Sequence, residues 1–597
     1  MDRLNIDVFR QFWTIAKSYW SGDEKWQARG LLLGVVLFLL AYTGLSVVLN
    51  NKRGVLISAL SAQDEPRFWQ TVIIFIAVLV IYAPLLAGYT YLRDRLSLQW
   101  RKWLTHRFVD NYFRDRAYYN LHISETEIDN PDQRIAEDVR SFTQESLTFV
   151  LVLVQSVLSV IAFSSVLWGI SKPLVFFLVL YALIGTLVTT VVFGKPLVRL
   201  NFEQLKKEAN LRFSLVRIRE NAEAIAFYRG EEQESNQVKQ RFLDVFKNVK
   251  RLLVWELNLN MLTNTYEFLP FVLPALVVAP AIFAGVMEVG KVSEAQGAFM
   301  RVFFSLNVVV ARFQQLTTFG AGINRLYTFA QFLEQTEVIQ ASDEQQPRIQ
   351  TVEADRLAVE HLSLQTPNYQ RTLVEDLSIE LPAGQGLLVM GPSGCGKSSL
   401  LRAIAGLWNS GTGAIVRPEP DQILFLPQRP YMVLGTLRDQ LLYPNTVRTF
   451  GEASVEPLTL TEAHLEVEEQ HLKQVLEQVN LAGLDERFGG FDAEQDWADV
   501  LSLGEQQRLT FARLLLNKPK YAILDEATSA LDLGNEERLY QHLQSKGTTF
   551  LSVGHRSTLA SYHQSLLELS QDKTWHIKQP LALIEEQPEL LELPSTT

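Results

Sequence analysis

Long apolar stretches that lack charged residues fill much of the first half of this chain. A helix needs about 20 such residues to cross the hydrocarbon core of a bilayer. Four stretches meet this requirement without interruption, and two more are interrupted by prolines or polar residues. The pattern therefore predicts six membrane-spanning helices, at residues 30–49, 72–91, 147–170, 174–193, 268–286 and 298–320.

The last two predicted spans carry residues that are unusual at membrane depth. The fifth contains three prolines, which are tolerated because neighbouring helices can satisfy the freed backbone groups. Ionisable groups within a span usually face a cavity or the bundle interior. Arg312 is therefore the leading candidate for a solute-pathway residue, whereas Arg301 fits a position outside the lipid equally well. The sixth span carries Arg301, Arg312, Gln314 and Gln315.

Residues 1–28 precede the first span and show aromatic side chains at helical spacing. This pattern predicts an amphipathic helix that lies in the membrane interface, with its aromatic rings at headgroup depth. A helix packed on protein is the alternative. The polar and charged start does not resemble a cleavable signal peptide. The residues that form the apolar stripe are Phe9, Phe12, Trp13, Ala16 and Trp20.

The second half of the chain has a glycine-rich loop between a predicted buried strand, residues 386–390, and a predicted helix, residues 398–405. The loop has the pattern G-x-x-x-x-G-K-S, in which backbone N–H groups turn inward to cradle phosphate oxygens. Lys397 can reach the β- and γ-phosphates, and the Ser398 hydroxyl can bind Mg²⁺. The candidate nucleotide-binding residues are Gly391, Pro392, Ser393, Gly394, Cys395, Gly396, Lys397, Ser398 and Ser399.

A second apolar strand, residues 521–526, ends in the carboxylates of Asp525 and Glu526. This arrangement suits Asp525 to hold Mg²⁺ and Glu526 to polarise the attacking water. Further motifs flank this strand: Gln428, the segment 501–508, the segment 529–532 and His555. In this order the motifs resemble the nucleotide-binding domain of ATP-binding cassette (ABC) transporters.

The resemblance assigns a role to each motif. It implies a Mg²⁺ site formed by Ser398, Gln428 and Asp525, and catalytic roles for Glu526 as general base, His555 as γ-phosphate sensor and Gln428 as the link to the membrane loops. It further implies that a second chain's ATP contacts the segment 501–505 and the segment 529–532. The residues concerned are Ser502, Gly504, Glu505 and Asp532.

Two regions of the first half point to one branch of this family: residues 128–135 after the second span, and residues 208–213 and 219–228 after the fourth. They look like the D (peroxisomal-type) subfamily of ABC half-transporters and its bacterial relatives with an SbmA/BacA-like membrane domain. The segment 501–505 reads Leu-Ser-Leu-Gly-Glu and departs from the usual Leu-Ser-Gly-Gly-Gln. It keeps the Ser502 hydroxyl and the Gly504 N–H at a helix N-terminus, where an anion is favoured.

The resemblance implies an α-helical membrane domain of six spans, like that of ABC exporters, followed by an α/β P-loop NTPase domain. We expect an interfacial helix at residues 1–28, the membrane domain at 29–333, a linker at 334–355, the cassette at 356–580 and a tail at 581–597. The cassette must face ATP in the cytosol, and the arginine-rich segment 93–116 fits a cytosolic loop. A bacterial inner membrane is the expected location.

Charge and rare residues add three expectations. The net charge of −11 argues against a nucleic-acid partner. Cys395 is the only cysteine, so there is no disulfide framework. Its place beside the phosphate cradle predicts an accessible, reactive thiol, and a thiol too enclosed to react is the alternative. Tyr369 is the aromatic residue nearest to the position, about Thr366, that stacks on adenine in many cassettes.

The expected function is ATP-driven solute transport by a homodimer in the lipid bilayer, with ATP and Mg²⁺ as cofactors. Three alternatives stay open on the sequence. The solute is hydrophilic or amphipathic, such as cobalamin or a peptide, or it is a fatty acyl compound or acyl-CoA, or the protein is an ATP-gated channel. The polar residues of the sixth span favour a polar or anionic solute. The sequence does not indicate the direction of transport.

Overall fold

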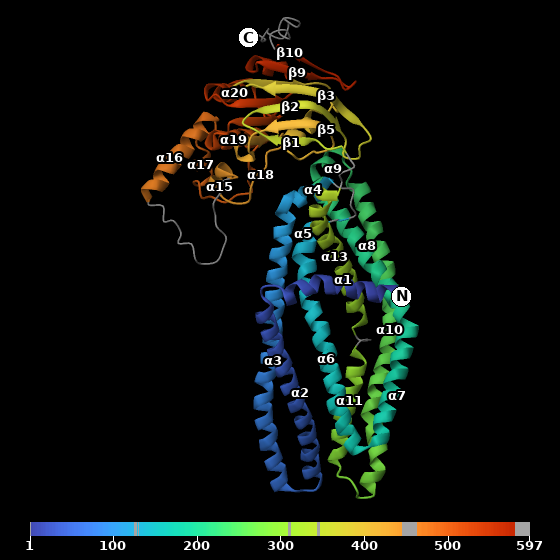
Figure 1. The fold of residues 1–597 in the computed structure, drawn as a ribbon. Coiled ribbons are helices and arrows are strands. Elements are labelled where there is room, and N and C mark those ends of the chain that lie inside the picture. Colours follow the sequence, from blue (N-terminus) through green and yellow to red (C-terminus); the bar gives the residue numbers. More distant parts are fainter. Residues whose placement is uncertain are drawn as a thin grey trace. The chain divides into compact units, whose positions relative to one another are not determined.

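The computed structural model describes residues 2–123, 128, 130–308, 312–342, 347–444 and 462–579. The chain divides into two compact units, Met1–Ser342 and Asp343–Thr597. The first is built from helices and the second contains every described strand (Figure 1).

The helical unit consists of long helices joined by short connections (Figure 1). Three helices, α2, α3 and α10, are far longer than a bilayer requires, so charged extensions continue beyond their apolar windows. The helices are α1 (Asp2–Ser21), α2 (Lys25–Ser61), α3 (Glu65–Phe113), α4 (Ala117–Ile123), α5 (Pro131–Gln133), α6 (Val139–Ile170), α7 (Lys172–Val188), α8 (Lys195–Glu220), α9 (Ala222–Tyr228), α10 (Glu231–Phe283), α11 (Gly290–Leu306) and α13 (Phe313–Ser342). Shorter helical segments are η1 (Arg114–Arg116), η2 (Arg134–Asp138) and η3 (Thr189–Gly194).

Among the described residues, four helical segments are long and apolar enough to cross a membrane: Lys25–Ser61, Glu65–Leu121, Pro131–Ile170 and Glu231–Phe283. They contain the first, second and third predicted spans and most of the fifth. A shorter apolar helix, Lys172–Gly185, covers much of the fourth predicted span. Five of the six predicted spans therefore fall wholly or largely on apolar helices, four of them long enough to cross a membrane.

The sixth predicted span, residues 298–320, is not one regular helix. Helix α11 ends at Leu306 and α13 begins at Phe313, and residues 309–311 between them lie outside the described ranges. The Asn307 side chain donates to the Phe303 carbonyl at 3.1 Å, a local bond that competes with regular helical hydrogen bonding. Polar residues at this position therefore coincide with an interruption of the helix.

Helix α1 uses its aromatic stripe in two ways. Ala16 is 1% exposed and packs in a core with residues of α3 and α13, as the protein-packed alternative predicts. Phe9 and Trp13 are 67% and 53% exposed, which leaves them free for the membrane interface. The apolar stripe therefore divides between a protein-packed edge and an outward-facing edge.

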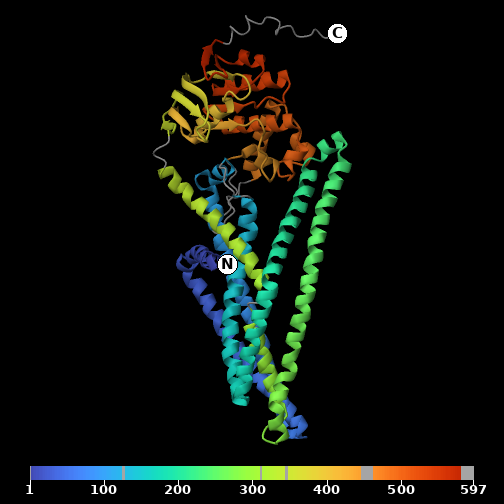
Figure 2. The ribbon, with the colours of Figure 1, turned by 90° about the vertical axis from the view of Figure 1, so that its right-hand side faces the viewer.

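Helices α8 and α10 pack along one another, and with α7 they form a long hairpin that leans away from the other helices of the unit (Figure 2). In charged segments outside the predicted spans, this hairpin exposes large apolar side chains. Surface apolar residues that gather on a charged segment usually mark an interaction site. They are Phe202, Leu205, Phe213, Leu215, Phe242, Phe246 and Leu253.

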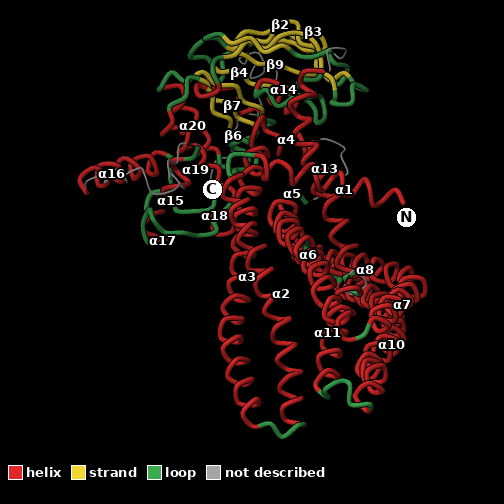
Figure 3. Tube along the Cα trace, turned by 60° about the horizontal axis from the view of Figure 1, so that its bottom comes forward, coloured by secondary structure: helices red, strands yellow, loops and turns green. Residues whose placement is uncertain are grey.

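The second unit holds two sheets (Figure 3). The four-stranded sheet has the order β1-β5-β2-β3, and the six-stranded sheet has the order β10-β9-β4-β8-β7-β6. The first is formed by β1 (Gln350–Glu353), β2 (Leu357–Gln365), β3 (Thr372–Leu381) and β5 (Gly411–Arg417). The second is formed by β4 (Gly386–Met390), β6 (Ile423–Leu426), β7 (Tyr521–Asp525), β8 (Thr549–Val553), β9 (Ser565–Leu569) and β10 (Trp575–Lys578).

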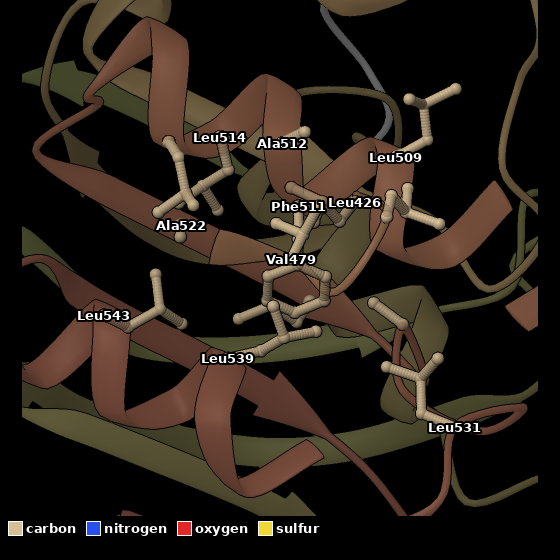
Figure 4. Close-up of a cluster of buried hydrophobic side chains, with 14 of the residues drawn as sticks. Leu426, Val479, Leu509, Phe511, Ala512, Leu514, Ala522, Leu531, Leu539 and Leu543 are labelled. Atoms are coloured by element: carbon tan, nitrogen blue, oxygen red, sulfur yellow. The ribbon is translucent and has the colours of Figure 1, made fainter. Parts of the chain in front are cut away.

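The six-stranded sheet is parallel except for β10, and its central strands β4, β8 and β7 are almost fully buried, as is typical of parallel strands covered on both faces. Side chains of α19 and α20 close the core on one face, with Phe511 and Leu539 among them (Figure 4). The helices of this unit are α14 (Lys397–Ile404), α15 (Leu437–Leu442), α16 (Glu462–Gln478), α17 (Leu484–Phe488), α18 (Trp497–Val500), α19 (Leu503–Asn517) and α20 (Leu533–Ser545), with the short turns η4 (Pro420–Gln422) and η5 (Ser557–Tyr562).

The stretch 334–355, expected to be a linker, is folded over much of its length. Helix α13 continues to Ser342, and β1 (Gln350–Glu353) pairs with β5 of the cassette. The glutamine- and glutamate-rich composition suggested a linker. Helices and strands with exposed surfaces can have the same composition, so composition alone did not reveal the end of α13 or strand β1. Residues 343–346 of the stretch and the predicted tail at 581–597 lie outside the described residues.

A buried histidine makes the stability of this unit depend on pH. His563 is 5% exposed between Tyr540 and Phe550, and its Nδ1 bonds to the Leu559 carbonyl. Burial lowers the pKa of its imidazole to about 4. The unfolded chain therefore takes up the proton first as the pH falls, and stability present above about pH 6.5 is lost progressively down to about pH 4.

When the pH is lowered from about 7.5 to about 5, we expect His563 alone to reduce the free energy of unfolding of the cassette by about 2 kcal/mol. His563→Phe should remove this part of the pH dependence, since an apolar ring fills the same site without titrating. Pulse proteolysis in urea measures the midpoint at both pH values. His576→Phe, at an exposed position, is the control. An unchanged pH response in His563→Phe would contradict the account.

Candidate functional site

The motifs singled out in the sequence meet at one edge of the six-stranded sheet. Neighbouring strands in this part of the sheet follow the order β4-β8-β7-β6 and run parallel. The glycine-rich loop follows β4, His555 follows β8, Glu526 follows β7 and Gln428 follows β6. Because the carboxyl ends of parallel strands share an edge, the topology alone brings these loops together.

Two glycines of the loop occupy positions that other residues would fill badly. Gly391 has φ +150°, and a Cβ built there would lie 2.3 Å from the Leu569 carbonyl oxygen. Gly396 has φ +107°, and its Cβ would lie 3.1 Å from Leu373 Cβ. The loop therefore passes close to β9 and β3, with backbone conformations that favour glycine.

The polar side chains of the loop lie beside the end of β7. Lys397 is 7% exposed, and its Nζ donates to the carbonyls of Gly391 at 2.7 Å and Pro392 at 3.0 Å. Ser398 Oγ lies 3.4 Å from Asp525 Oδ1. Burial, followed by the nearby charge of Glu526, raises the pKa of the Asp525 carboxyl. A bound cation would relieve this unfavourable placement, and hydroxyl plus carboxylate oxygens are the ligands that Mg²⁺ prefers.

Glu526 is held by the two side chains predicted to work with it. Gln428 Nε2 donates to Glu526 Oε2 at 2.7 Å, and His555 Nε2 lies 3.2 Å from Glu526 Oε1. The backbone of Glu526 has φ +48°, a left-handed conformation that is costly for a residue with a side chain. Such strain persists where the surroundings fix it, and it is common at functional sites.

Comparison with known proteins agrees with this geometry. The family model described as ABC transporter transmembrane region 2 matches residues 15–283, and the model described as ABC transporter matches residues 374–529. An uncharacterized ABC transporter ATP-binding protein of Synechocystis is 44% identical over 93% of this chain and 82% of its own length. The chain belongs to the ABC transporter family. It is accordingly a membrane protein with an ATP-binding domain, and an ATPase.

Two further relatives of this ABC transporter fix its subfamily. ABC transporter D family member 2, chloroplastic, of Arabidopsis thaliana is 40% identical over 96% of this chain and 88% of the relative. The lysosomal cobalamin transporter ABCD4 of Mus musculus is 31% identical over 96% of this chain and 97% of the relative. The resemblance to the D subfamily is thus confirmed.

The segment 501–505, here called the signature, leads into α19 and caps the start of that helix by reciprocal hydrogen bonds. Ser502 is the N-cap, and its N–H and hydroxyl donate to Glu505 Oε2 at 2.9 and 2.8 Å. Arg487 donates to the other carboxylate oxygen at 2.7 Å. Burial acts to raise the pKa of Glu505, but these hydrogen bonds and the Arg487 charge outweigh it and lower the pKa. Glu505 thus shapes the helix start here, a role that the family resemblance alone did not indicate.

Asp532, predicted to contact nucleotide, caps α20. Its carboxylate accepts the Asn535 N–H at 2.9 Å and the Asn535 side chain at 2.6 Å, and these bonds lower its pKa. Sequence reasoning missed Gln507, which is 0% exposed and donates to the Gln428 carbonyl at 3.3 Å. The sequence gives the position of Gln507 two residues after Glu505, but it does not indicate that the side chain of a helical glutamine is buried.

One expectation about the cassette is wrong, and another stays a prediction. The Cys395 thiol was expected to be accessible, which is wrong: it is 2% exposed and belongs to the apolar core under β4 and α14. A cysteine in a glycine-rich loop can turn its side chain inward, because only backbone groups are needed for the phosphate cradle. Tyr369 has φ +57° in a tight turn closed by its own N–H and the Thr366 carbonyl, so adenine stacking by Tyr369 stays a prediction.

The helical unit contains a second candidate site, a cavity of about 770 Å³. Three arginines line it: the predicted Arg301 and Arg312, and Arg53 of α2. Among the described residues no acidic side chain pairs with any of the three. Arg312 donates to Gln315 Oε1 at 3.4 Å, and the side chain of Gln314 lies outside the described residues. Arg53 was missed because it follows the predicted span 30–49.

The remaining wall of the cavity combines amides and hydroxyls with aromatic rings. A solute with an anionic group would find guanidinium groups that have no carboxylate partner among the described residues, and an apolar part would find aromatic surface. The polar wall includes Asn50, Gln155, Ser156 and Gln296, and the aromatic wall includes Phe75, Phe163, Phe271 and Phe304.

Proposed function

We propose that this ABC transporter is a homodimer that couples ATP hydrolysis at two composite sites to the movement of a hydrophilic or amphipathic solute, such as cobalamin or a peptide. The observation that carries the proposal is the cavity of the membrane unit with its three arginines. We place the cassette in the cytosol on the basis of the arginine-rich segment 93–116, and the helices in a bacterial inner membrane on the basis of the bacterial relative.

A second copy of the chain is the partner that fits best. The apolar side chains on the α8–α10 hairpin lie among charged residues, outside the predicted spans, and lipid would not cover them there. An equivalent hairpin from a second copy has matching surfaces and would bury them. In the same dimer, Ser502 and Gly504 of one chain would lie against the glycine-rich loop of the other chain (residues 391–398, here called the P-loop), as the family resemblance implies.

Hydrolysis needs a base beside the attacking water. We assign this role to Glu526, because Gln428 and His555 fix both oxygens of its carboxylate. When bound, ATP supplies the phosphoryl group, and Mg²⁺ neutralises its charge. Ser398 and Asp525 would hold Mg²⁺ together with Gln428, and Lys397 would exchange its carbonyl partners for phosphate oxygens. As the water oxygen bonds to the γ-phosphorus and the bond to ADP breaks, one proton of that water passes to the Glu526 carboxylate.

The cavity favours a solute that carries a negative group. An arginine at membrane depth is costly unless it faces water or a partner, and these three face the cavity. The relative named for cobalamin transport makes cobalamin a first solute to test. The aromatic wall also favours a solute with an apolar part, so acyl-CoA belongs in the same panel.

Transport assays in oriented proteoliposomes test the proposal. Cobalamin, a peptide set and acyl-CoAs are offered on each side, with ATP on the cassette side. Solute movement that requires hydrolysable ATP and stimulates ATPase supports a pump. Movement with a non-hydrolysable ATP analogue, down the gradient only, would establish an ATP-gated channel instead.

Arg312→Ala tests the cavity directly. We expect basal ATPase to stay near the wild-type rate, because Arg312 lies in the membrane unit, while the solute concentration for half-maximal stimulation rises about tenfold, the effect of one lost charged hydrogen bond. Solute-stimulated ATPase is the measurement. Arg312→Lys, which keeps the charge, should lose less, and Arg199→Ala on exposed α8 is the control. Equal stimulation of all these variants would make Arg312 a structural residue only.

A further inference from the structure

Residues 529–532, here called the D-loop, are held on one side by a buried glutamine. The Gln507 amide oxygen accepts the Ala530 N–H at 3.0 Å, and its nitrogen donates to Ser529 Oγ at 3.2 Å. The same nitrogen donates to the Gln428 carbonyl. A single side chain of α19 therefore joins the D-loop to the loop that carries Gln428.

Arg556 holds the D-loop from the other side. It follows His555 directly, and its guanidinium donates to the Leu531 carbonyl through Nη1 and to the Ser529 carbonyl through Nη2, both at 2.9 Å. A planar guanidinium can hold two fixed acceptors at once, which an ammonium cannot do with the same geometry. The backbone next to His555 is therefore tied to the D-loop at two points.

A buried carboxylate fixes Arg556 in this position. Glu536 of α20 has 0% side-chain exposure, and its Oε2 lies 3.3 Å from Arg556 Nη1. Thr558 Oγ1 donates to the other oxygen at 3.3 Å. A buried charge requires a partner, so Arg556 cannot leave this place without a penalty. The Arg556 guanidinium is therefore held between Glu536 of α20 and the backbone of the D-loop.

These contacts close a ring around the proposed base. Gln428 and His555 both contact the Glu526 carboxylate. Arg556, the residue after His555, donates to the D-loop backbone. Gln507 bonds to the D-loop and also donates to the Gln428 carbonyl, which completes the ring. We infer that Arg556 is a positioning residue for ATP hydrolysis. By fixing the backbone of His555 against the D-loop, it sets the imidazole toward Glu526. This inference rests on the proposed role of Glu526.

The test replaces Arg556 in the full-length transporter by Lys and by Met. Lys keeps a charge for Glu536 but cannot hold both D-loop carbonyls, so it separates positioning from charge burial. We expect kcat to fall about 10-fold for Arg556→Lys and about 100-fold for Arg556→Met, as for a misplaced catalytic group. The dissociation constant of a fluorescent ATP analogue should change by less than about twofold, because Arg556 has no place in the phosphate cradle.

Two controls make the outcome decisive. Arg538→Met alters an exposed arginine of the same helix α20 and should leave kcat unchanged. The urea midpoint of the cassette is measured for each variant by pulse proteolysis. An unchanged kcat in Arg556→Lys and Arg556→Met would overturn the inference. So would a loss of kcat that tracks a lower urea midpoint or weaker ATP binding.

Glu526→Gln is assayed in the same series to separate the two claims. If Glu526→Gln abolishes hydrolysis while the Arg556 variants keep the wild-type kcat, the positioning role fails and the base assignment stands. If Glu526→Gln keeps its turnover, the proposed base is wrong and the inference falls with it.

Discussion

Glu526→Gln should bind ATP with unchanged affinity and hydrolyse it about 10²–10³ times more slowly. The amide keeps the shape of the carboxylate and can still bond to one of its two partners, but it cannot accept a proton from water. Because ATP would then persist in the site, the variant should accumulate as a closed dimer. Single-turnover hydrolysis and cross-linking between cassettes measure the two effects.

A matched control is available on the next helix. Glu537→Gln changes an exposed carboxylate of α20 and should leave turnover within about twofold of wild type. Near-normal turnover in Glu526→Gln would move the base role elsewhere, and His555, which lies 3.2 Å from the same carboxylate, would be the next candidate.

Mixing two inactive chains should restore ATPase activity. Lys397→Ala damages the P-loop, and Ser502→Arg places a bulky cation at the N-cap of α19. If each site combines the P-loop of one chain with the signature of the other, a mixed dimer carries one doubly damaged site and one intact site. A random mixture should then regain up to about a quarter of the wild-type rate, since half of the dimers are mixed and each has one working site of two.

The ATPase rate of co-expressed, doubly tagged dimers measures this complementation. Each parent dimer alone should be almost inactive, and two copies of the same variant with different tags serve as the control for tagging. A mixture no more active than its parents would contradict composite sites that fire independently.

In the candidate nucleotide site, the sequence indicated which loops lie together, while the roles of their residues stay predictions. Its residues come directly after apolar strands, and parallel strands deliver their carboxyl ends to one edge whatever their order along the chain. Gln428, Glu526 and His555 are far apart in sequence, yet the structure places them within hydrogen-bonding distance, as the motif order led us to expect.

What the sequence could not supply were the contacts that depend on burial and side-chain direction. Cys395 stands in a polar loop but turns into the core. Arg53 lies beyond a predicted span but lines the cavity with Arg301. Arg556 looks like an ordinary surface arginine until its partners, the D-loop carbonyls and Glu536, are located. None of these follows from periodicity or spacing.

The most direct test of the central claim is to measure solute movement and ATP hydrolysis together in oriented proteoliposomes. The account predicts that at least one solute with an anionic group moves against its gradient with wild-type protein and MgATP, and that Glu526→Gln abolishes both movement and hydrolysis. Movement of that solute at the wild-type rate by Glu526→Gln, with hydrolysis lost, would show that hydrolysis does not drive transport.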